Sequence, residues 1–253
     1  MLVLERHRHL LHLLSQQGSV RTVEVAKKLG VTEETVRRDF EKLESEGELL
    51  RSHGGAVSIE TSRKDFTITE RSKQNAAEKK RIARTALGHI KQGETIFLDA
   101  STTAYQLALM LPDQPLTVIT NSLQTALSLS EKPAIRTVVL GGTLNPSSLS
   151  CTGWGAEQGL DIHRIDAAFI SCRGLDPQNG LSEASEEQAR MKSRVIQRAG
   201  MTILLADHSK TGLASSYFFS NNSDVDLWIT DAPPENHVLE SLSSQGIRIE
   251  IAR

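Results

Sequence analysis

The chain has 253 residues, more than one typical domain of about 100 to 200 residues requires, so we expect one large or two unequal domains. Its 29 Lys and Arg residues are balanced by 31 Asp and Glu residues, and the formal net charge of -2 excludes a polybasic coat or an acidic tail as the basis of function. Any contact with nucleic acid must therefore be made by a local patch.

The two cysteines, Cys151 and Cys172, are far apart and form no CxxC pair. This spacing argues against a disulfide framework and against a cysteine-based zinc site. Residues 1–20 are interrupted by charged residues and histidines and lack the apolar run of a signal peptide. No other segment reaches the roughly 20 apolar residues of a membrane span. We therefore expect a soluble cytoplasmic protein without membrane contact.

Residues 1–57 are expected to form three short helices and a hairpin. The first helix is indicated by leucines near helical spacing and is closed by a turn signal at residues 17–18; these leucines are Leu4, Leu10, Leu11 and Leu14. In the second helix, Thr22 is the expected N-cap and Gly30 stands just past the end.

The third helix is predicted to begin after the N-cap Thr32 and to end at Gly47. Its apolar positions Val36, Phe40 and Leu43 fall at i, i+4 and i+7 and form one stripe. The polar residues directed away from this stripe are Thr35, Arg37 and Arg38.

Apolar residues then flank Ser52-His53-Gly54-Gly55. We expect a tight hairpin in which the two glycines supply the positive φ that the turn requires, so this segment is predicted to be a β-wing.

Helix, turn, helix and wing in this order have the layout of a winged helix-turn-helix. A recognition helix presents its N-terminal half to the major groove, where Arg can bridge guanine O6 and N7, and the wing meets the backbone or the minor groove. The candidate DNA-binding residues are Thr32, Thr35, Arg37, Arg38, Arg51, His53, Gly54 and Gly55. The alternative is a solvated helix face, in which these arginines pair with their acidic neighbours Glu33, Glu34, Asp39 and Glu41.

Net charge does not decide between the two, because residues 1–57 hold nine Lys or Arg and nine Asp or Glu. However, residues 20–57 resemble the N-terminal signature of the DeoR family of bacterial sugar-metabolism regulators. The resemblance places the DNA-binding candidates on the family motif, together with Val36, Asp39, Leu43 and Gly47, and with Phe40 where many members carry Leu. It implies double-stranded operator DNA as a partner.

Residues 58–77 are polar and follow no period, so we predict a linker here. An amphipathic helix with Ile82, Ala86 and Ile90 every four residues then opens a second domain, residues 78–253. The rest of this domain alternates helical segments with apolar runs, which predicts βαβ units and a mainly parallel α/β sheet. The predicted strands are residues 95–98, 116–120, 137–140, 167–170, 202–205, 227–230 and 247–251.

Polar residues follow several of these strands, at the edge where ligands sit in an open α/β sheet. Asp99 ends the first strand, and a small-residue turn then opens a helix at Thr102 or Thr103. Free backbone N–H groups and hydroxyls at such a turn suit a phosphate, although a Ser-Thr-Thr sequence can also be only a helix cap. Similar strand ends lie at residues 120–122, 141–143 and 207–210.

Residues 66–253 also resemble the DeoR effector domain, which is similar in fold to ribose-5-phosphate isomerases and binds phosphorylated sugars in many members. The resemblance implies that Ser101, Thr102 and Thr103 cradle the phosphate and that Lys210 matches an active-site lysine of the isomerases. Lys192 falls where members often have lysine, but a solvated helix face explains it nearly as well. The full effector-binding set is Asp99, Ser101, Thr102, Thr103, Thr120, Asn121, Gly141, Gly142, Arg173, Lys192 and Lys210.

An isomerase-like enzyme is the alternative, since those relatives transfer protons with carboxylates beside a glycine-rich loop. Here Cys172 and Arg173 stand where the isomerases carry acids, and no run of consecutive glycines follows. One turn before Lys192, Gln188 stands where several relatives of the DeoR effector domain have an acid. The histidines show no metal-ligand spacing, so neither a metal nor a cofactor is expected.

The sequence therefore favours a homo-oligomeric transcription regulator that is not an enzyme. We expect repression of a carbohydrate-utilisation operon, relieved by a phosphorylated sugar. A DNA-binding protein without a sensor and a protein-binding adaptor are the further alternatives.

Overall fold

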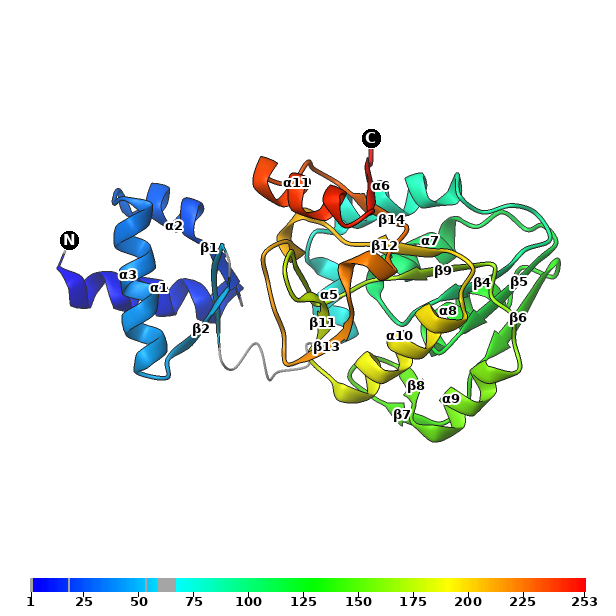
Figure 1. Cartoon of the computed structure of the whole chain (residues 1–253). Coiled ribbons are helices and arrows are strands. Elements are labelled where there is room, and N and C mark those ends of the chain that lie inside the picture. The colour runs from blue at the N-terminus through cyan, green and yellow to red at the C-terminus, as the bar shows by residue number, and fades with distance from the viewer. Residues whose placement is uncertain (1, 18, 53, 59–66) are drawn as a thin grey trace.

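The computed structural model describes residues 2–17, 19–52, 54–58 and 67–253. Figure 1 shows a small N-terminal part, with helices packed beside a short sheet, and a larger C-terminal part built on a central sheet. Within the described residues, no helix is both long enough and apolar enough to cross a membrane.

The N-terminal part contains the predicted three helices and wing. Its elements are α1 (Val3–Gln17), β1 (Ser19–Arg21), α2 (Thr22–Leu29), α3 (Glu33–Ser45), β2 (Leu49–Ser52) and β3 (Gly55–Ser58). The strands form an antiparallel sheet in the order β1-β3-β2, in which β1 was not predicted. Leu10, Phe40 and Leu49 lie in its core, whereas Leu4, expected on the apolar stripe of α1, is 69% exposed.

Local capping explains where α2 and α3 begin and end. The side chain of Thr32 accepts a hydrogen bond from the Thr35 N–H at 3.2 Å, as predicted for the N-cap of α3. Gly30 ends α2 in the left-handed conformation, with φ of 64°. The predicted N-cap of α2 is wrong by one residue: Arg21 occupies this position, without a side-chain cap, and Thr22 is the first helical residue.

Gly55 is required for a reason other than the one predicted. Its φ lies outside the positive range, but a Cβ at this position would stand 2.0 Å from the carbonyl oxygen of Val20 on the neighbouring strand β1. Close approach of two strands therefore demands glycine here. Gly54 lies in the exposed turn, and His53 lies outside the described residues.

The C-terminal part is built on a seven-stranded sheet in which every pair is parallel, in the order β15-β14-β12-β9-β4-β5-β6. Its strands are β4 (Thr95–Leu98), β5 (Leu116–Thr120), β6 (Ile135–Val139), β9 (Ala167–Ile170), β12 (Thr202–Leu205), β14 (Leu227–Thr230) and β15 (Arg248–Ile251). The predicted parallel α/β fold is thereby confirmed, and the bounds of β6 and β15 differ slightly from those predicted.

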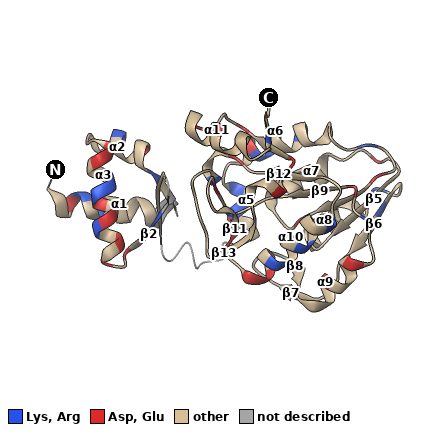
Figure 2. Ribbon diagram, viewed as in Figure 1, with Lys and Arg blue, Asp and Glu red and all other residues tan. Residues whose placement is uncertain are grey.

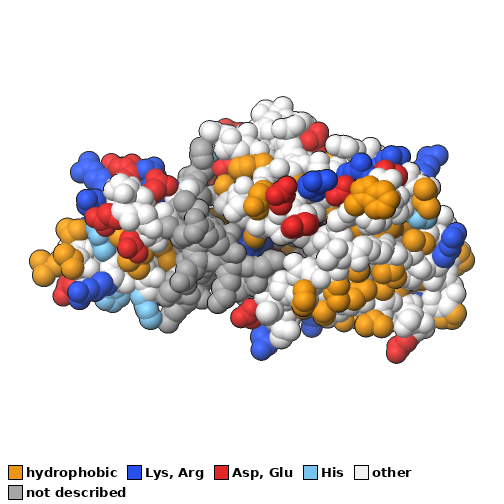
Figure 3. Space-filling view, turned by 90° about the horizontal axis from the view of Figure 1, so that it is seen from below, with side chains coloured by type: hydrophobic (Ala, Val, Ile, Leu, Met, Phe, Trp, Pro, Cys, Tyr) orange, Lys and Arg blue, Asp and Glu red, His pale blue; other side chains and the backbone are white. Residues whose placement is uncertain are grey.

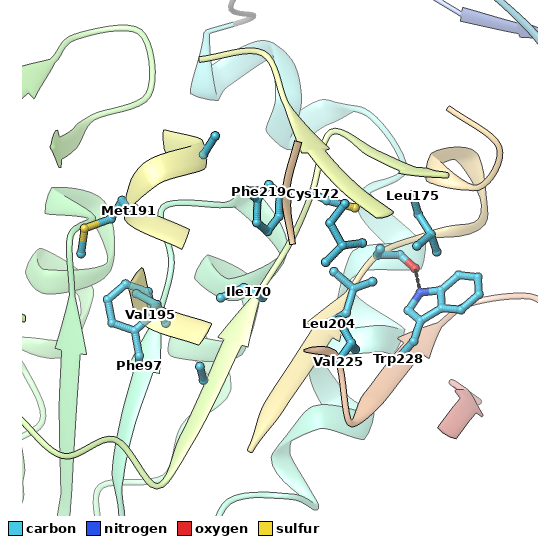
Figure 4. Close-up of a cluster of buried hydrophobic side chains, with 14 of the residues drawn as sticks. Phe97, Ile170, Cys172, Leu175, Met191, Val195, Leu204, Phe219, Val225 and Trp228 are labelled. Carbon is cyan, nitrogen blue, oxygen red and sulfur yellow. Dashed lines mark hydrogen bonds between the residues drawn. The ribbon is translucent and has the colours of Figure 1, made fainter. Parts of the chain in front are cut away.

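Helices cover both faces of this sheet. One face packs against α6 (Ala76–Leu87), α7 (Thr102–Met110) and α8 (Leu123–Leu129), and the other against α9 (Trp154–Asp161), α10 (Glu186–Arg198) and α11 (Asn236–Ser244). Figure 4 shows the core under α10, where the indole of Trp228 donates a hydrogen bond to the Ala206 carbonyl oxygen at 2.9 Å. Burial of both sheet faces explains why the five inner strands are nearly continuous apolar runs.

Short antiparallel strands that were not predicted extend this scaffold. They are β7 (Thr143–Asn145) with β8 (Ser150–Thr152), and a sheet of β10 (Gly174–Asp176), β11 (Gly180–Glu183) and β13 (Tyr217–Ser220). Two 3₁₀ turns lie at residues 208–210 and 222–224.

The second half of the predicted linker is helical. Helix α5 (Ile68–Lys73) begins with a capping box, in which Thr67 caps the Glu70 N–H and Glu70 accepts from the Thr67 N–H at 2.9 Å. Ile68 is buried, and its N–H donates to the Ser147 carbonyl oxygen at 2.7 Å. Thus α5 packs with the C-terminal part. The division at residue 78 remains a prediction.

Candidate nucleic-acid interface and anion pocket

The arginines of α3 are exposed and paired along their own helix. The side chains of Arg37 and Arg38 are 54% and 76% exposed, and they contact Glu33 at 3.1 Å and Glu34 at 3.3 Å. Figure 2 shows these opposite charges alternating along α3. Such pairs contribute only about 0.3 to 0.5 kcal/mol each, so the arginines can exchange them for phosphates or base edges.

The other DNA-binding candidates divide into two places. Thr32 and Thr35 share the N-terminal turn of α3, where their hydroxyls lie 2.8 Å apart. Arg51, on β2, instead contacts Glu41 at 3.0 Å, near the C-terminal half of α3. The structure therefore places Thr32 and Thr35 at the first turn of α3, about one turn before the exposed arginines, and it places Arg51 and Gly54–Gly55 on the wing.

Asp39 does not belong to the solvated face that the alternative assigned to it. It is 4% exposed, and its carboxylate accepts two hydrogen bonds from Arg6, at 2.5 and 2.8 Å, and approaches His7 at 3.1 Å. Burial alone would raise the pKa of Asp39, but Arg6 and His7 hold it below its ordinary value. This pair fixes α3 against α1, a contact between residues 33 positions apart that no local pattern reveals.

A polar pocket opens beyond the carboxyl ends of β4, β9 and β12. Because α7 follows β4 on one face of the sheet and α10 lies on the other, the pocket occupies the kind of crevice in which open α/β sheets bind ligands. The residues lining it are Arg71, Gln74, Lys79, Ala100, Ser101, Thr102, Thr103, Ser148, Ser171, Cys172, Arg173, Glu183, Gln188, Lys192 and Lys210.

The N-terminus of α7 forms one wall of this pocket. Ser101 is the N-cap and accepts from the Ala104 N–H at 3.1 Å, so its hydroxyl serves the helix, as the cap reading predicted. Thr102 and Thr103 are the first two residues of α7, and both line the pocket, so their N–H groups belong to the helix N-terminus. A helix N-terminus with such groups favours an anion.

Lys192 lies at the centre of a buried ionic cluster, so its reading as part of a solvated face is wrong. Its side chain is 6% exposed and contacts Asp99 at 3.1 Å, Glu183, and the Ser171 carbonyl oxygen at 2.6 Å. Burial lowers the pKa of Lys192, but the carboxylates of Glu183 and Asp99 outweigh it and raise the pKa. Asp99 also accepts from the N–H groups of Ser101 and Ser171, at 3.0 and 2.9 Å, and so lies behind the pocket wall.

Two cations of the pocket come from the segment predicted to be a linker and its border. Lys79 on α6 is 6% exposed and donates to the carbonyl oxygens of Arg71 and Gln74 at 2.5 and 2.6 Å. Burial, reinforced by Lys210, lowers the pKa of Lys79 to about 8. Arg71 on α5 has its Nε and Nη2 atoms buried without any hydrogen-bond partner in the described part of the chain. The capping-box sequence TxxE at Thr67 could have revealed α5.

Five predicted effector residues lie outside this pocket lining: Asp99, which lies behind the wall, and Thr120, Asn121, Gly141 and Gly142. Thr120 donates to the Leu98 carbonyl oxygen at 2.7 Å, and Asn121 donates to that of Cys151 at 3.1 Å. Gly142 has φ of 117°, and a Cβ there would stand 2.4 Å from the Thr152 carbonyl oxygen. Within the described fold these residues serve the backbone of loops, and β6, which precedes the glycines, is the edge strand two places from β4.

Two residues of the pocket lining, Cys172 and Gln188, are uncharged near neutral pH. Burial, reinforced by Glu183, raises the pKa of Cys172 to about 12, so the thiol is neutral near pH 7. Gln188 donates to the Ser150 hydroxyl at 2.5 Å. Among the described residues, no three His, Cys, Asp or Glu side chains gather as a metal site would require.

Both parts match models of one family. Residues 6–71 match a DeoR-like helix-turn-helix domain, and residues 74–232 match a DeoR C-terminal sensor domain. The chain belongs to the DeoR family of helix-turn-helix transcriptional regulators. An uncharacterized HTH-type transcriptional regulator of Bacillus subtilis, YulB, is 42% identical, covering 98% of this chain and 96% of its own. The glycerol-3-phosphate regulon repressor of Escherichia coli is 31% identical, with 98% of each chain covered.

Ribose-5-phosphate isomerase A of Methanocaldococcus jannaschii is similar in structure over 55% of each chain, with 19% identity and a TM-score of 0.42. The family membership confirms that this DeoR regulator joins a helix-turn-helix DNA-reading domain to a sensor domain, as the sequence predicted. Below, the DNA-reading domain denotes residues 2–58, and the sensor domain denotes residues 67–253.

Proposed function

We propose that this regulator represses carbohydrate-utilisation genes and releases its operator when a phosphorylated sugar or a related phosphate occupies the sensor pocket. The observation that carries the proposal is the charge of the pocket lining, where, among the described residues, five cations face a single carboxylate, Glu183. The cations are Arg71, Lys79, Arg173, Lys192 and Lys210.

The arrangement of these charges supports an anion as the effector. Lys192 is neutralised by Asp99 and Glu183, whereas Arg71 has donors without partners, and Thr102 and Thr103 add a helix N-terminus. A phosphate carries two negative charges and accepts several hydrogen bonds, so it can satisfy these groups together. The hydroxyls and amide of Ser148, Ser171 and Gln188 line the same pocket and suit the hydroxyls of a sugar or polyol. A relative named for a glycerol-3-phosphate regulon agrees with this chemistry.

The same geometry supports a sensor over an isomerase. Proton transfer beside a carbonyl requires a positioned base whose pKa is tuned to the working pH. Glu183, the carboxylate of the described lining, is bound to Lys192, and the Cys172 thiol is protonated near neutral pH. We therefore expect purified protein to leave aldose and ketose phosphates unconverted in a coupled isomerase assay.

On the DNA side, we propose that Arg37 and Arg38, with Thr32 and Thr35, read the major groove, and that the wing contacts the backbone. A homo-oligomer would present two such helices to paired half-sites. Large apolar side chains remain exposed between β7 and the end of α9, on the side of the sensor domain where Figure 3 shows apolar groups gathering. Exposed apolar patches of this kind support association between copies. Three of these residues are Leu144, Trp154 and Ile162.

The test is operator binding to the DNA upstream of the protein's own gene, titrated with sugar and polyol phosphates and with the matching unphosphorylated compounds. We expect release by one phosphorylated compound and by none of the unphosphorylated ones. Tight operator binding that no compound alters would contradict the proposal that the pocket senses a phosphorylated effector. An absence of operator binding would contradict the proposal that the protein regulates these genes.

A further inference from the structure

Two of the contacts that join helix α5 and its C-terminal end to the sensor domain lie at the rim of the pocket. Its first N–H donates to the Ser147 carbonyl oxygen, beside the lining residue Ser148. After its end, the side chain of Asn75 donates to Asp207 at 2.9 Å and to the Ser209 hydroxyl at 3.1 Å. Asp207 and Ser209 belong to the turn that carries the lining residue Lys210. The position of α5 thus depends on two segments that also shape the pocket.

Asn75 holds the connection between α5 and α6 in an unusual backbone conformation. Its φ of 50° and ψ of 41° are left-handed, a region that residues other than glycine adopt infrequently. Asn is one of the residue types that tolerate this conformation, and here its amide is fixed by the Asp207 turn. Lys79 spans the same connection through the Arg71 and Gln74 carbonyl oxygens.

Arg71 is the one side chain of α5 that lines the pocket, among the residues described. An arginine nitrogen buried without a partner is costly, because its lost hydration is not replaced. Two such nitrogens, Nε and Nη2, are the pair that binds a phosphate or carboxylate in a bidentate way. The arginine is therefore placed for a ligand that supplies its missing acceptors.

We propose that Arg71 binds the anionic group of the effector and that this contact fixes α5, the element that follows the DNA-reading domain in the chain. The anion then binds the state in which α5 is docked more tightly than the state in which α5 is undocked. Such a difference in affinity is what couples the sensor pocket to the DNA-reading domain. This inference rests on the proposed function, since it names the residue through which the same pocket controls the DNA-reading domain.

The experiment combines hydrogen exchange with affinity measurements on the full chain. Inorganic phosphate and glycerol 3-phosphate serve as probes, with chloride at equal ionic strength as the reference. The variants are Arg71→Gln and Arg71→Lys, and Lys73→Ala, an exposed position on the same helix, is the matched control. The readouts are the dissociation constant of each probe and the amide exchange rates of residues 67–80.

In the wild type and in Lys73→Ala, we expect that binding of a probe slows amide exchange across residues 67–80. Loss of a charge-assisted bidentate contact in Arg71→Gln should weaken that probe about 10- to 100-fold and abolish the slowing at saturation, with Arg71→Lys intermediate. Near-wild-type affinity and slowing in Arg71→Gln would overturn the inference. If neither probe binds the wild type while another phosphorylated compound releases the operator, that compound replaces the probes; if no compound acts, the proposed function itself fails.

Discussion

The two domains of this regulator treat charge in opposite ways. In the DNA-reading domain, Arg37 and Arg38 are exposed and are satisfied by glutamates one turn away. In the sensor domain, Lys79 and Lys192 are buried, and Arg71 has buried nitrogens without partners. Exposed pairs are weak and are exchanged at little cost, whereas buried cations need a full set of partners.

This difference indicates how each domain meets its ligand. The arginines of α3 can exchange their glutamates for contacts with any stretch of duplex DNA. Specificity for one sequence then comes from the order of the DNA-contacting side chains along the helix. The sensor pocket holds its cations in fixed places before any ligand arrives, so it discriminates by charge and geometry. The DNA-reading domain also contains one buried pair, Arg6 with Asp39, and that pair serves folding.

The largest expected effect is on that buried pair. Asp39→Ala leaves the Arg6 guanidinium buried without a carboxylate, which should destabilise the DNA-reading domain by about 3 to 5 kcal/mol. Because the pKa of Asp39 is lowered in the fold, the contribution of the pair is present above about pH 4 and is lost as the pH falls further. Calorimetry should show that the unfolding transition of the DNA-reading domain moves to a lower temperature in Asp39→Ala. Glu34→Ala, which removes an exposed pair, should leave that transition temperature nearly unchanged.

The second effect is on the sensor domain. Lys192→Met leaves Asp99 and Glu183 close together without their shared cation, and we expect a loss of about 3 kcal/mol in denaturant unfolding followed by a sensor-domain signal. If Lys192 were a solvated surface lysine, the substitution would change stability by less than about 0.5 kcal/mol.

The third effect is a pH dependence. Burial lowers the pKa of Lys79 to about 8 in the folded domain, whereas the lysine of the unfolded chain has a pKa of about 10.4. Between these two pH values the unfolded chain binds one proton more than the folded domain. The stability of the domain should therefore rise with pH over this interval, by an amount on the order of 2 kcal/mol. A bound phosphate should reduce the gain, because it stabilises the charged lysine. Unfolding of Lys79→Met should lack this gain, and unfolding of Lys80→Met, at an exposed neighbour, should retain it.

The smallest effect is on the exposed arginines. Arg38→Ala should leave stability within about 0.5 kcal/mol of the wild type but weaken operator binding about 10-fold and reduce the salt slope by about 1. Fluorescence anisotropy at several salt concentrations measures both quantities. Unchanged operator affinity together with an unchanged slope would place Arg38 on the solvated face instead.

Much of the scaffold was predictable because local physics determines it. The five inner strands of the parallel sheet are buried on both faces, so they are short apolar runs. Thr32 and Gly30 have the side chain and the backbone freedom that helix ends require. The short strands β7, β8, β10, β11 and β13 were missed, because each is only three or four residues long, too short for an alternating apolar pattern to stand out.

The pocket was predictable only in part. The strand-end rule found Thr102, Thr103 and Lys210, which lie after β4 and β12 near the centre of the sheet. The same rule also selected Gly141 and Gly142, which lie outside this lining, because it cannot tell a central strand from the edge strand β6. Arg71 was missed because the polar segment that contains it was interpreted as a linker. The ion pair between Asp99 and Lys192 was not predictable, because it joins residues 93 positions apart in the chain.

The central claim is that the two domains are energetically coupled, and linkage tests it most directly. The releasing phosphate compound should bind free protein more tightly than it binds the protein–operator complex. Calorimetric titration gives this ratio, and it must equal the factor by which the compound weakens operator affinity, typically about 5- to 150-fold. Equal affinity for free and operator-bound protein would contradict the account.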